Sequence, residues 1–409
     1  MGIAEDALVF TDPKAYADEP RFHAACRRLR AEAPVVRVDA PDFDPFYAVT
    51  RHEDVMEVEC HPERWINAPR PALGPKRGDA VDPADVPVRT LVQMDGADHL
   101  MYRHVSADWF KPRNIARLGD RAAELSRQAV DHMASLGGRC DFFTEVAMSY
   151  PLSMILSLLG LPEEDFGRML KLTQELFGNH DPEMAREGSE NVFLETMMDF
   201  FTYFQGIVDD RQARPVDDLA SKIANAEVDG APIGLMETIG YYVIIATAGH
   251  DTTSAAISGG MHALLQHPDQ LARLQADPTL VGTAVDEMIR WVSPVKQFMR
   301  TATEGTVLRG VPIAEGEAVL LSFPSANRDE AVFTDPDRFD VGRTPNRHLG
   351  FGFGAHYCLG THLAKLEMKA LYNELIPRLR HIELDGDAEY TRTLFVGGPK
   401  HVPVRYEMV

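Results

Sequence analysis

The sequence predicts a mainly α-helical protein with small β-sheets, folded as a single domain over residues 1–409. Apolar residues recur at helical spacing through the middle of the chain. Short β-prone runs separated by glycine follow this helical part. No Gly/Ser linker, low-complexity tract or fixed-period repeat divides the 409 residues, of which 45% are hydrophobic. The chain can therefore bury one large core.

A long irregular segment, about residues 65–92, lies in the N-terminal third. Five prolines exclude a regular helix or strand there: Pro69, Pro71, Pro75, Pro83 and Pro87. Loops of this length in compact domains are usually functional, so we expect a mobile loop beside a site.

Helical periodicity dominates the chain that follows. It covers residues 115–206, in which residues 176–204 are rich in Phe and Met. That composition suits an adaptable apolar surface or an ordinary helix core. A further helix is expected at about 235–267, ending before Pro268, and another at 279–292. The β-prone runs come last, at residues 306–308, 311–313 and 318–323.

Charge and composition exclude several classes of function. The formal net charge of −21 argues against nucleic acid and anionic membranes as partners, because a phosphate-binding surface needs clustered cations. The most apolar stretch, residues 238–250, is too short to span a bilayer, and the N-terminus has no targeting pattern. Four widely spaced cysteines fit no disulfide framework: Cys26, Cys60, Cys140 and Cys358. We expect a cytoplasmic protein and take it to be a monomer.

The glycine-rich segment 350–360 gives Cys358 an unusual setting, and a helical pattern follows it. Glycines let a backbone approach a planar cofactor, and amides at a helix N-terminus stabilise a thiolate. Three other interpretations are a buried structural cysteine, a zinc site with His356 and His362, and a phosphate loop at Gly350, Gly352 and Gly354. A structural cysteine does not explain the surrounding glycines. A zinc site would need a second pair of Cys or His ligands, which is missing. The phosphate-loop motif is incomplete.

The pattern Phe-x-x-Gly-x-x-x-Cys-x-Gly over residues 351–360 closely resembles the haem-binding signature of cytochromes P450. The resemblance implies the cytochrome P450 fold, with haem b held between a long distal helix and the proximal cysteine loop. It also implies that Cys358 is the iron ligand and that Phe351 and Gly352 bind the cofactor. In this family the thiolate pushes electron density onto iron and favours O–O cleavage.

Glu287 and Arg290 stand three residues apart and share one face of the helix expected at 279–292. Alone they would be a surface pair of small energetic value. The resemblance implies that they are buried and joined by Arg338, from the later Pro-Asp-Arg-Phe segment. The expected role of this network is folding and haem retention.

Asp251 and Thr252 form an acid–alcohol pair inside an otherwise apolar helical stretch, and His250 separates the pair from the small residues Ala248 and Gly249. An isolated Asp-Thr pair could be a helix N-cap, but the apolar pattern continues on both sides. The segment resembles the distal-helix motif of P450 monooxygenases. The resemblance implies that Thr252 positions oxygen and water, that Asp251 relays protons, and that Ala248 lies against the haem.

Haem carries two propionates, so its burial requires cationic partners. His99 and Arg103 lie one helical turn apart, and Arg300 and His356 stand at positions that also match the family. Each alone would more commonly be a surface residue. Together they are the expected propionate partners.

The resemblance extends over essentially the whole chain, and the C-terminal half is especially similar to the alpha-terpineol hydroxylase group. It implies a compact hydrophobic substrate, a terpenoid or an alkyl-aromatic. By family position the pocket draws on seven residues, although core packing explains each one equally well: Phe177, Ile244, Ala248, Val295, Phe298, Phe395 and Val396.

The resulting hypothesis is a haem-thiolate monooxygenase that uses O2 and two electrons from a ferredoxin and its ferredoxin reductase, since no redox domain is fused to the chain. A basic docking face is expected from four residues, which scattered surface charges would explain equally: Arg113, Arg343, Arg347 and Lys365. The alternatives are a peroxide-driven peroxygenase and a non-catalytic haem sensor or binding protein.

Overall fold

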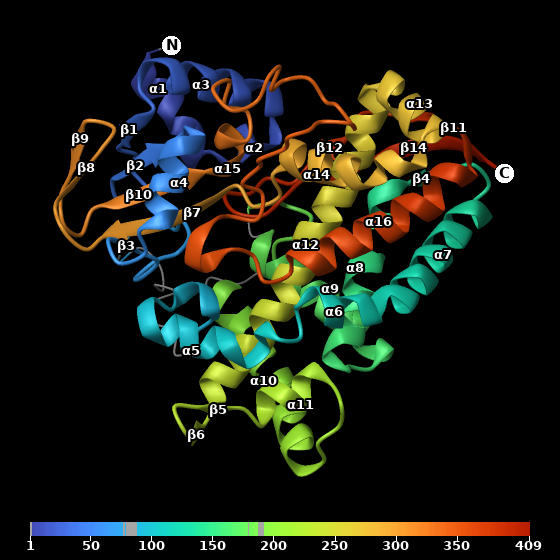
Figure 1. Cartoon of the computed structure of the whole chain (residues 1–409), viewed down its shortest axis with the longest axis horizontal. Coiled ribbons are helices and arrows are strands. Elements are labelled where there is room, and N and C mark those ends of the chain that lie inside the picture. The colour runs from blue at the N-terminus through green and yellow to red at the C-terminus, as the bar shows by residue number, and fades with distance from the viewer. Residues whose placement is uncertain (1, 77, 79–87, 179, 187–191) are drawn as a thin grey trace.

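The computed structural model describes residues 2–76, 78, 88–178, 180–186 and 192–409. It is mainly α-helical with small sheets, as the sequence predicts, and Figure 1 shows the larger sheet with the N-terminal helices at the left and most other helices, with a smaller sheet, toward the right. The helices are α1 (Ile3–Ala7), α2 (Pro13–Ala17), α3 (Glu19–Glu32), α4 (His52–Cys60), α5 (Gly96–Ala107), α6 (Pro112–Ile115), α7 (Gly119–Ser135), α8 (Ser149–Leu159), α9 (Phe166–Phe177), α10 (Val192–Ala213), α11 (Leu219–Ala224), α12 (Leu235–Gln266), α13 (Pro268–Ala276), α14 (Val281–Val292), α15 (Phe323–Ala326) and α16 (Thr361–Arg378).

A five-stranded sheet, with the strand order β1-β2-β10-β7-β3, lies at the left of the molecule in Figure 1. Only the β10–β2 pairing is parallel. The remaining strands form one three-stranded and three two-stranded sheets among the described residues. The strand bounds are β1 (Val35–Val38), β2 (Phe46–Val49), β3 (Trp65–Ile66), β4 (Arg139–Asp141), β5 (Glu227–Val228), β6 (Ala231–Pro232), β7 (Gln297–Ala302), β8 (Thr306–Leu308), β9 (Val311–Ile313), β10 (Ala318–Ser322), β11 (Leu379–Leu384), β12 (Glu389–Tyr390), β13 (Pro399–His401) and β14 (Pro403–Met408).

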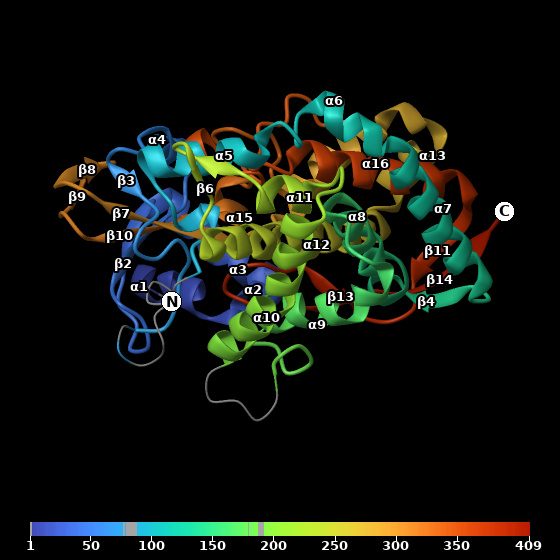
Figure 2. The same ribbon diagram turned by 90° about the horizontal axis from the view of Figure 1, so that it is seen from below.

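Helix α12 runs through the middle of the molecule and organises the helical half. It contacts α8, α10 and α14, and Figure 2 shows it between α16 on one side and α9 and β13 on the other. It ends at Gln266 because Pro268 begins the next helix, which confirms the helix predicted at about 235–267. Most of its side chains are buried, and in its middle part the exceptions are Ile244, Ala248, Gly249, Asp251 and Thr252.

Three predicted β-prone runs are confirmed as β8, β9 and β10, but β7 was not predicted. Four of its six residues are buried and the other two are partly buried, so β7 lacks the alternation of polar and apolar residues that reveals a half-exposed strand. The omission matters because β7 carries both Phe298 and Arg300. Of the irregular segment predicted at about 65–92, residues 77 and 79–87 lie outside the described residues. No helix in the described part of the chain combines the length and the apolar character that crossing a bilayer requires.

Candidate active site

The cysteine loop is shaped by glycines at conformations that other residues rarely adopt. Gly352 and Gly354 have φ of +66° and +67°. A Cβ atom on Gly354 would lie 2.1 Å from the backbone oxygen of Glu59 at the end of α4, so only glycine fits against that turn. The amide of Cys358 donates to the carbonyl of Phe351, 2.9 Å away, which closes the loop just before α16 begins at Thr361.

Cys358 has an accessible surface, yet its thiol is deeply enclosed by protein atoms, so its sulfur borders a space inside the fold. Burial raises the pKa of the Cys358 thiol, while hydrogen bonds from Gly360 and Thr361 and the charge of Arg103 lower it. The Thr361 hydroxyl also donates to the Cys358 carbonyl at 2.8 Å, which fixes the junction between loop and helix. The helix N-terminus therefore stabilises the anionic form of the sulfur, as a metal-binding thiolate requires.

Four basic side chains that the sequence predicts as cofactor partners come together beside this loop. The rings of His99 and His356 are stacked, with centroids 3.9 Å apart. Arg103, one turn after His99 on α5, donates to the carbonyl of Tyr357 at 2.5 Å. Arg300 reaches the same region from β7 and is 3% exposed.

These bases disfavour each other's positive charge. Burial, then Arg103, lowers the pKa of His99 to about 4. Burial, followed by the charges of His99, Arg300 and Arg103, lowers the pKa of His356 to about 2. Two carboxylates partly offset the charge: Glu59 accepts from Arg300 at 3.2 Å, and Asp95 lies 4.0 Å from His356.

The residues present fit a haem group. The space beside the Cys358 sulfur has a cluster of mutually repelling bases on its border, which a pair of anionic propionates would relieve. Across α12, Ala248 is exposed although the helix around it is largely buried, so a small side chain faces open space there. Cys358 would hold the iron, and His99, Arg103, Arg300 and His356 would hold the propionates.

On α12 the acid–alcohol pair lies next to Ala248. The Thr252 hydroxyl donates to the Ala248 carbonyl at 2.7 Å. Burial raises the pKa of Asp251, and His250 and Thr173 act against that rise. One carboxyl oxygen of Asp251, Oδ1, lies 3.3 Å from His250 Nδ1. The other, Oδ2, is buried and has no hydrogen-bond partner among the described residues.

Five of the seven predicted pocket residues form an apolar group. The ring of Phe395 lies 5.3 Å from that of Phe298 and 5.8 Å from that of Phe177, between centroids. Val295 and Val396 pair as an isolated β-bridge. The other two, Ile244 and Ala248, lie one turn apart on α12.

The buried acid–base network contains a different arginine from the predicted one. Glu287 and Arg290 are both fully buried and form two hydrogen bonds, at 2.7 and 2.8 Å. The guanidinium that joins them belongs to Arg343, whose Nε lies 3.0 and 3.1 Å from the two Glu287 oxygens. The assignment of Arg338 was wrong: its side chain is exposed, and it contributes its backbone carbonyl to Arg290 and Arg343. A turn five residues later in the chain brings Arg343 back toward α14.

This result also removes Arg343 from the predicted basic docking face, because its side chain is 10% exposed. Lys365 is partly buried and bonds Asp286 at 2.7 Å. Arg113 and Arg347 are exposed, so they remain available to a partner.

Sequence reasoning missed His250, Thr173 and Glu59, which contact the predicted residues from α12, α9 and α4. A polar residue between Gly249 and Asp251, in an apolar helix, was the available signal for His250.

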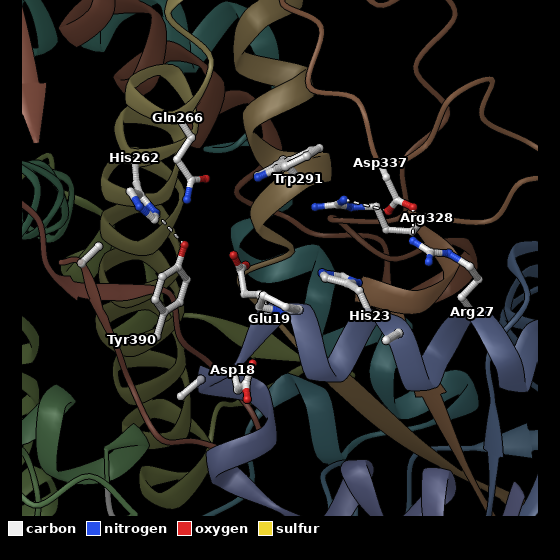
Figure 3. A pocket seen from close by; sticks show the side chains of 14 residues that line it. Asp18, Glu19, His23, Arg27, His262, Gln266, Trp291, Arg328, Asp337 and Tyr390 are labelled. Atoms are coloured by element: carbon white, nitrogen blue, oxygen red, sulfur yellow. Dashed lines mark hydrogen bonds and ion pairs between the residues drawn. The ribbon is translucent and has the colours of Figure 1, made fainter. Parts of the chain in front are cut away.

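A second hollow, of about 650 Å³, lies between α3 and α14 (Figure 3). Its wall mixes acidic Asp18, Glu19 and Asp337 with basic Arg27 and Arg328, and the Arg328 guanidinium stacks on Trp291 at 3.6 Å. None of the residues on its wall belongs to the site around Cys358.

Known proteins resemble this chain over nearly its full length. A family model described as Cytochrome P450 matches residues 152–393. "Cytochrome P450-terp" of a Pseudomonas species is 41% identical, over 96% of this chain and 95% of that protein. A steroid C26-monooxygenase of Mycolicibacterium smegmatis is 32% identical, over 93% of this chain and 91% of that protein.

Two solved structures have the same fold. CYP108D1 from Novosphingobium aromaticivorans superposes with a TM-score of 0.89 at 38% identity, covering 99% of both chains. Cytochrome P450 CYP268A2 of Mycobacterium marinum, in complex with pseudoionone, superposes with a TM-score of 0.88 at 32% identity, covering 96% of both chains.

Proposed function

Since the chain belongs to the cytochrome P450 family of haem b-dependent monooxygenases, we propose that it hydroxylates a small hydrophobic substrate, a terpenoid or an alkyl-aromatic. We also propose that its two electrons come from a ferredoxin and a ferredoxin reductase. The observation that carries the proposal is the arrangement of one site from five separate elements. The cysteine loop, α5, β7, α12 and the segment around Phe395 each contribute one part of it.

The chemistry supplied by bound haem is the cleavage of dioxygen, with one oxygen atom inserted into a C–H bond and the other released as water. The residues of the chain control where this happens. Burial raises the pKa of the Cys358 thiol, and hydrogen bonds from Gly360 and Thr361 act against that rise and so favour the anionic sulfur that would hold the iron. The four basic residues beside the loop would anchor the propionates.

Proton supply belongs to α12. The Thr252 hydroxyl is fixed by its bond to the Ala248 carbonyl, so its oxygen lone pairs point away from the helix and can accept a hydrogen bond from water. Asp251 keeps one oxygen free of partners among the described residues, and that oxygen can exchange protons with water. Burial raises the pKa of the Asp251 carboxyl group, so it holds a proton more readily than an exposed carboxyl group does.

The substrate class follows from the apolar group around Phe395. Three aromatic rings and two valines offer flat, apolar walls without a charged side chain among them. Such walls suit a compact hydrocarbon skeleton. The relative named for terp, and the neighbour that holds pseudoionone, support a terpenoid.

The test is reconstituted turnover. Purified holoenzyme, a bacterial ferredoxin and its reductase are mixed with NADH and a panel of monoterpenoids, alkyl-aromatics, steroids and fatty acids. We expect hydroxylated products from the first two groups only. Turnover with hydrogen peroxide alone, and none with ferredoxin, would support a peroxygenase instead.

Thr252 provides a sharper version of this test. Thr252→Ala is expected to bind substrate normally but to release a large share of the electrons as hydrogen peroxide, because proton delivery is no longer ordered. Thr252→Ser keeps the hydroxyl and should stay coupled. Product formation in Thr252→Ala at the wild-type ratio to NADH would contradict the role given to this residue.

A further inference from the structure

We propose that His250 is a positioning residue that holds Asp251 in place and shares one exchangeable proton with it, so that the His250–Asp251 pair is the proton store of the active site. The inference rests on the proposed monooxygenase function. It adds His250, the residue before Asp251 on α12. His250 lies away from the space that Ala248 and Thr252 border.

His250 is held rigidly by three elements. Its side chain is 1% exposed on α12. Its Nε2 lies 3.0 Å from the backbone oxygen of Met148, at the start of α8. Its Nδ1 lies 3.2 Å from the hydroxyl of Thr173 on α9, and Thr173 is fully buried. A surface histidine would have none of these constraints.

The contact with Met148 fixes the tautomer. A carbonyl oxygen only accepts hydrogen bonds, so Nε2 must carry a hydrogen to make this one. In the neutral ring Nδ1 is then the acceptor, and it faces Asp251 Oδ1 at 3.3 Å. A proton between these two atoms can reside on either one, as a neutral acid and imidazole or as a carboxylate and imidazolium.

The Thr173 hydroxyl lies beside the same pair, and its hydrogen bond with Asp251 lowers the pKa of that carboxyl group. The hydroxyl oxygen is also 3.0 Å from the carbonyl of Leu170, which can accept its single hydrogen. The hydroxyl can then accept from His250 Nδ1 in the imidazolium form. Thr173 therefore accommodates both proton positions, and burial raises the pKa of the Asp251 carboxyl group.

The two carboxyl oxygens of Asp251 have different surroundings. Oδ1 faces His250, whereas Oδ2 is buried without a hydrogen-bond partner among the described residues. An unpartnered buried carboxyl oxygen is costly unless water or another group reaches it. Oδ2 is thus the oxygen through which the pair passes its proton to water near Thr252. Each proton released is replaced by one from solvent, and the pair returns to its original charge.

Two variants distinguish the contributions of the two ring nitrogens of His250. In His250→Asn the amide lies near the position of Nδ1 and can still hold Asp251, whereas in His250→Gln it reaches the position of Nε2 and keeps only the Met148 contact. Neither amide exchanges protons at neutral pH. His262→Gln is the matched control, because His262 is also buried on α12 and its Nδ1 bonds Tyr390 at 2.8 Å.

The activity measurement is the fraction of NADH electrons recovered in product, together with the solvent deuterium isotope effect on turnover. We expect His250→Gln to lower coupling several-fold and to raise the isotope effect, with the substrate-binding spectrum and KM unchanged. His250→Asn should lower coupling less than His250→Gln does, and His262→Gln should leave coupling unchanged. The combination of His250→Gln with Asp251→Asn should be no worse than Asp251→Asn alone, because both act through one proton.

A second measurement does not depend on turnover, and so separates this proposal from the proposed function. In the reduced, carbon monoxide-bound holoenzyme, the 15N signals of His250 are assigned by their loss in His250→Asn. We expect a protonated Nε2 and an Nδ1 signal that moves when Asp251 is replaced by Asn. Equal coupling in His250→Gln and His262→Gln, or an Nδ1 signal unmoved by Asp251→Asn, would overturn the proposal.

Discussion

Arg343 shows how one side chain completes a buried charge network. It gives Glu287 a second guanidinium beside that of Arg290, and the amide of Asn346 adds a further hydrogen bond at 3.1 Å. A fully buried carboxylate is tolerated only when its oxygens are satisfied in this way. The network joins α14 to the long irregular segment that leads into the cysteine loop.

Replacement of Arg343 by Ala should therefore destabilise the fold by about 1.5–3 kcal/mol, the usual value of a hydrogen bond to a charged group. Arg338→Ala should change stability little, because that side chain is exposed and only its backbone is used. Chemical denaturation of the two variants checks this, with haem retention as a second measure. A larger loss in Arg338→Ala would restore the sequence-based assignment.

The local motifs were predictable from sequence, because neighbouring residues carry them. Cys358 with its glycines, and Asp251 with Thr252, are read directly from adjacent positions. Arg343 could not be distinguished from Arg338 in this way, since both are arginines in one irregular segment and only the path of the turn decides which one reaches Glu287. The Thr173 contact joins residues 77 positions apart and leaves no local pattern.

At the scale of elements, the cysteine loop depends on its packing against α4. Gly354 combines a left-handed φ of +67° with a carbonyl where its side chain would be. A non-glycine residue in this conformation costs about 1–2 kcal/mol before any clash is counted.

Gly354→Ala should for that reason displace the loop and weaken haem binding, which can be followed by haem transfer to apomyoglobin. Gly305→Ala is the control, because a Cβ there meets nothing within 4 Å. Equal rates of haem loss in the two variants would show that the loop conformation does not hold the cofactor.

A second element junction lies between β13 and the segment after α9. Lys400 bonds Asp181 at 3.0 Å and Glu183 at 2.7 Å, and His401 bonds Glu183 and Asp141 at 2.9 and 2.8 Å. Burial lowers the pKa of His401, but hydrogen bonds with Glu183 and Asp141 outweigh it and raise the pKa. Hydrogen bonds from Lys400 and His401 lower the pKa of Glu183.

The signs of these shifts define a pH window. The contribution of His401 is complete below its unfolded value of 6.5 and is lost as pH rises through the raised folded pKa. That of Glu183 is complete above 4.5 and is lost as pH falls through the lowered folded pKa. The difference in Tm between wild type and His401→Gln should be largest between these values and shrink at alkaline pH. A difference that grows with pH would contradict the assignment.

For the molecule as a whole, the sequence predicts the fold class and the distal helix well, because long periodic helices carry strong signals. It predicts sheet membership poorly: β1 and β2 come from the N-terminal part and pair with each other, and β2 also pairs with β10 from far along the chain. The convergence of the four bases follows from that sheet, since β7 brings Arg300 to α5 and the cysteine loop.

The acidic composition of the whole chain does not describe the surroundings of Cys358. The chain carries a net −21, yet a group of basic residues lies inside it beside Cys358. Such a group is explained by an anionic cofactor and not by the overall composition. These bases and the Cys358 sulfur would therefore hold haem as a thiolate complex.

The most direct test is the carbon monoxide difference spectrum of the dithionite-reduced holoenzyme. Thiolate ligation predicts a strongly red-shifted Soret band in the wild type and its loss in Cys358→His, which supplies a neutral ligand instead. A haem-loaded wild-type protein without the red-shifted band, or a Cys358→His variant that keeps it, would contradict the account.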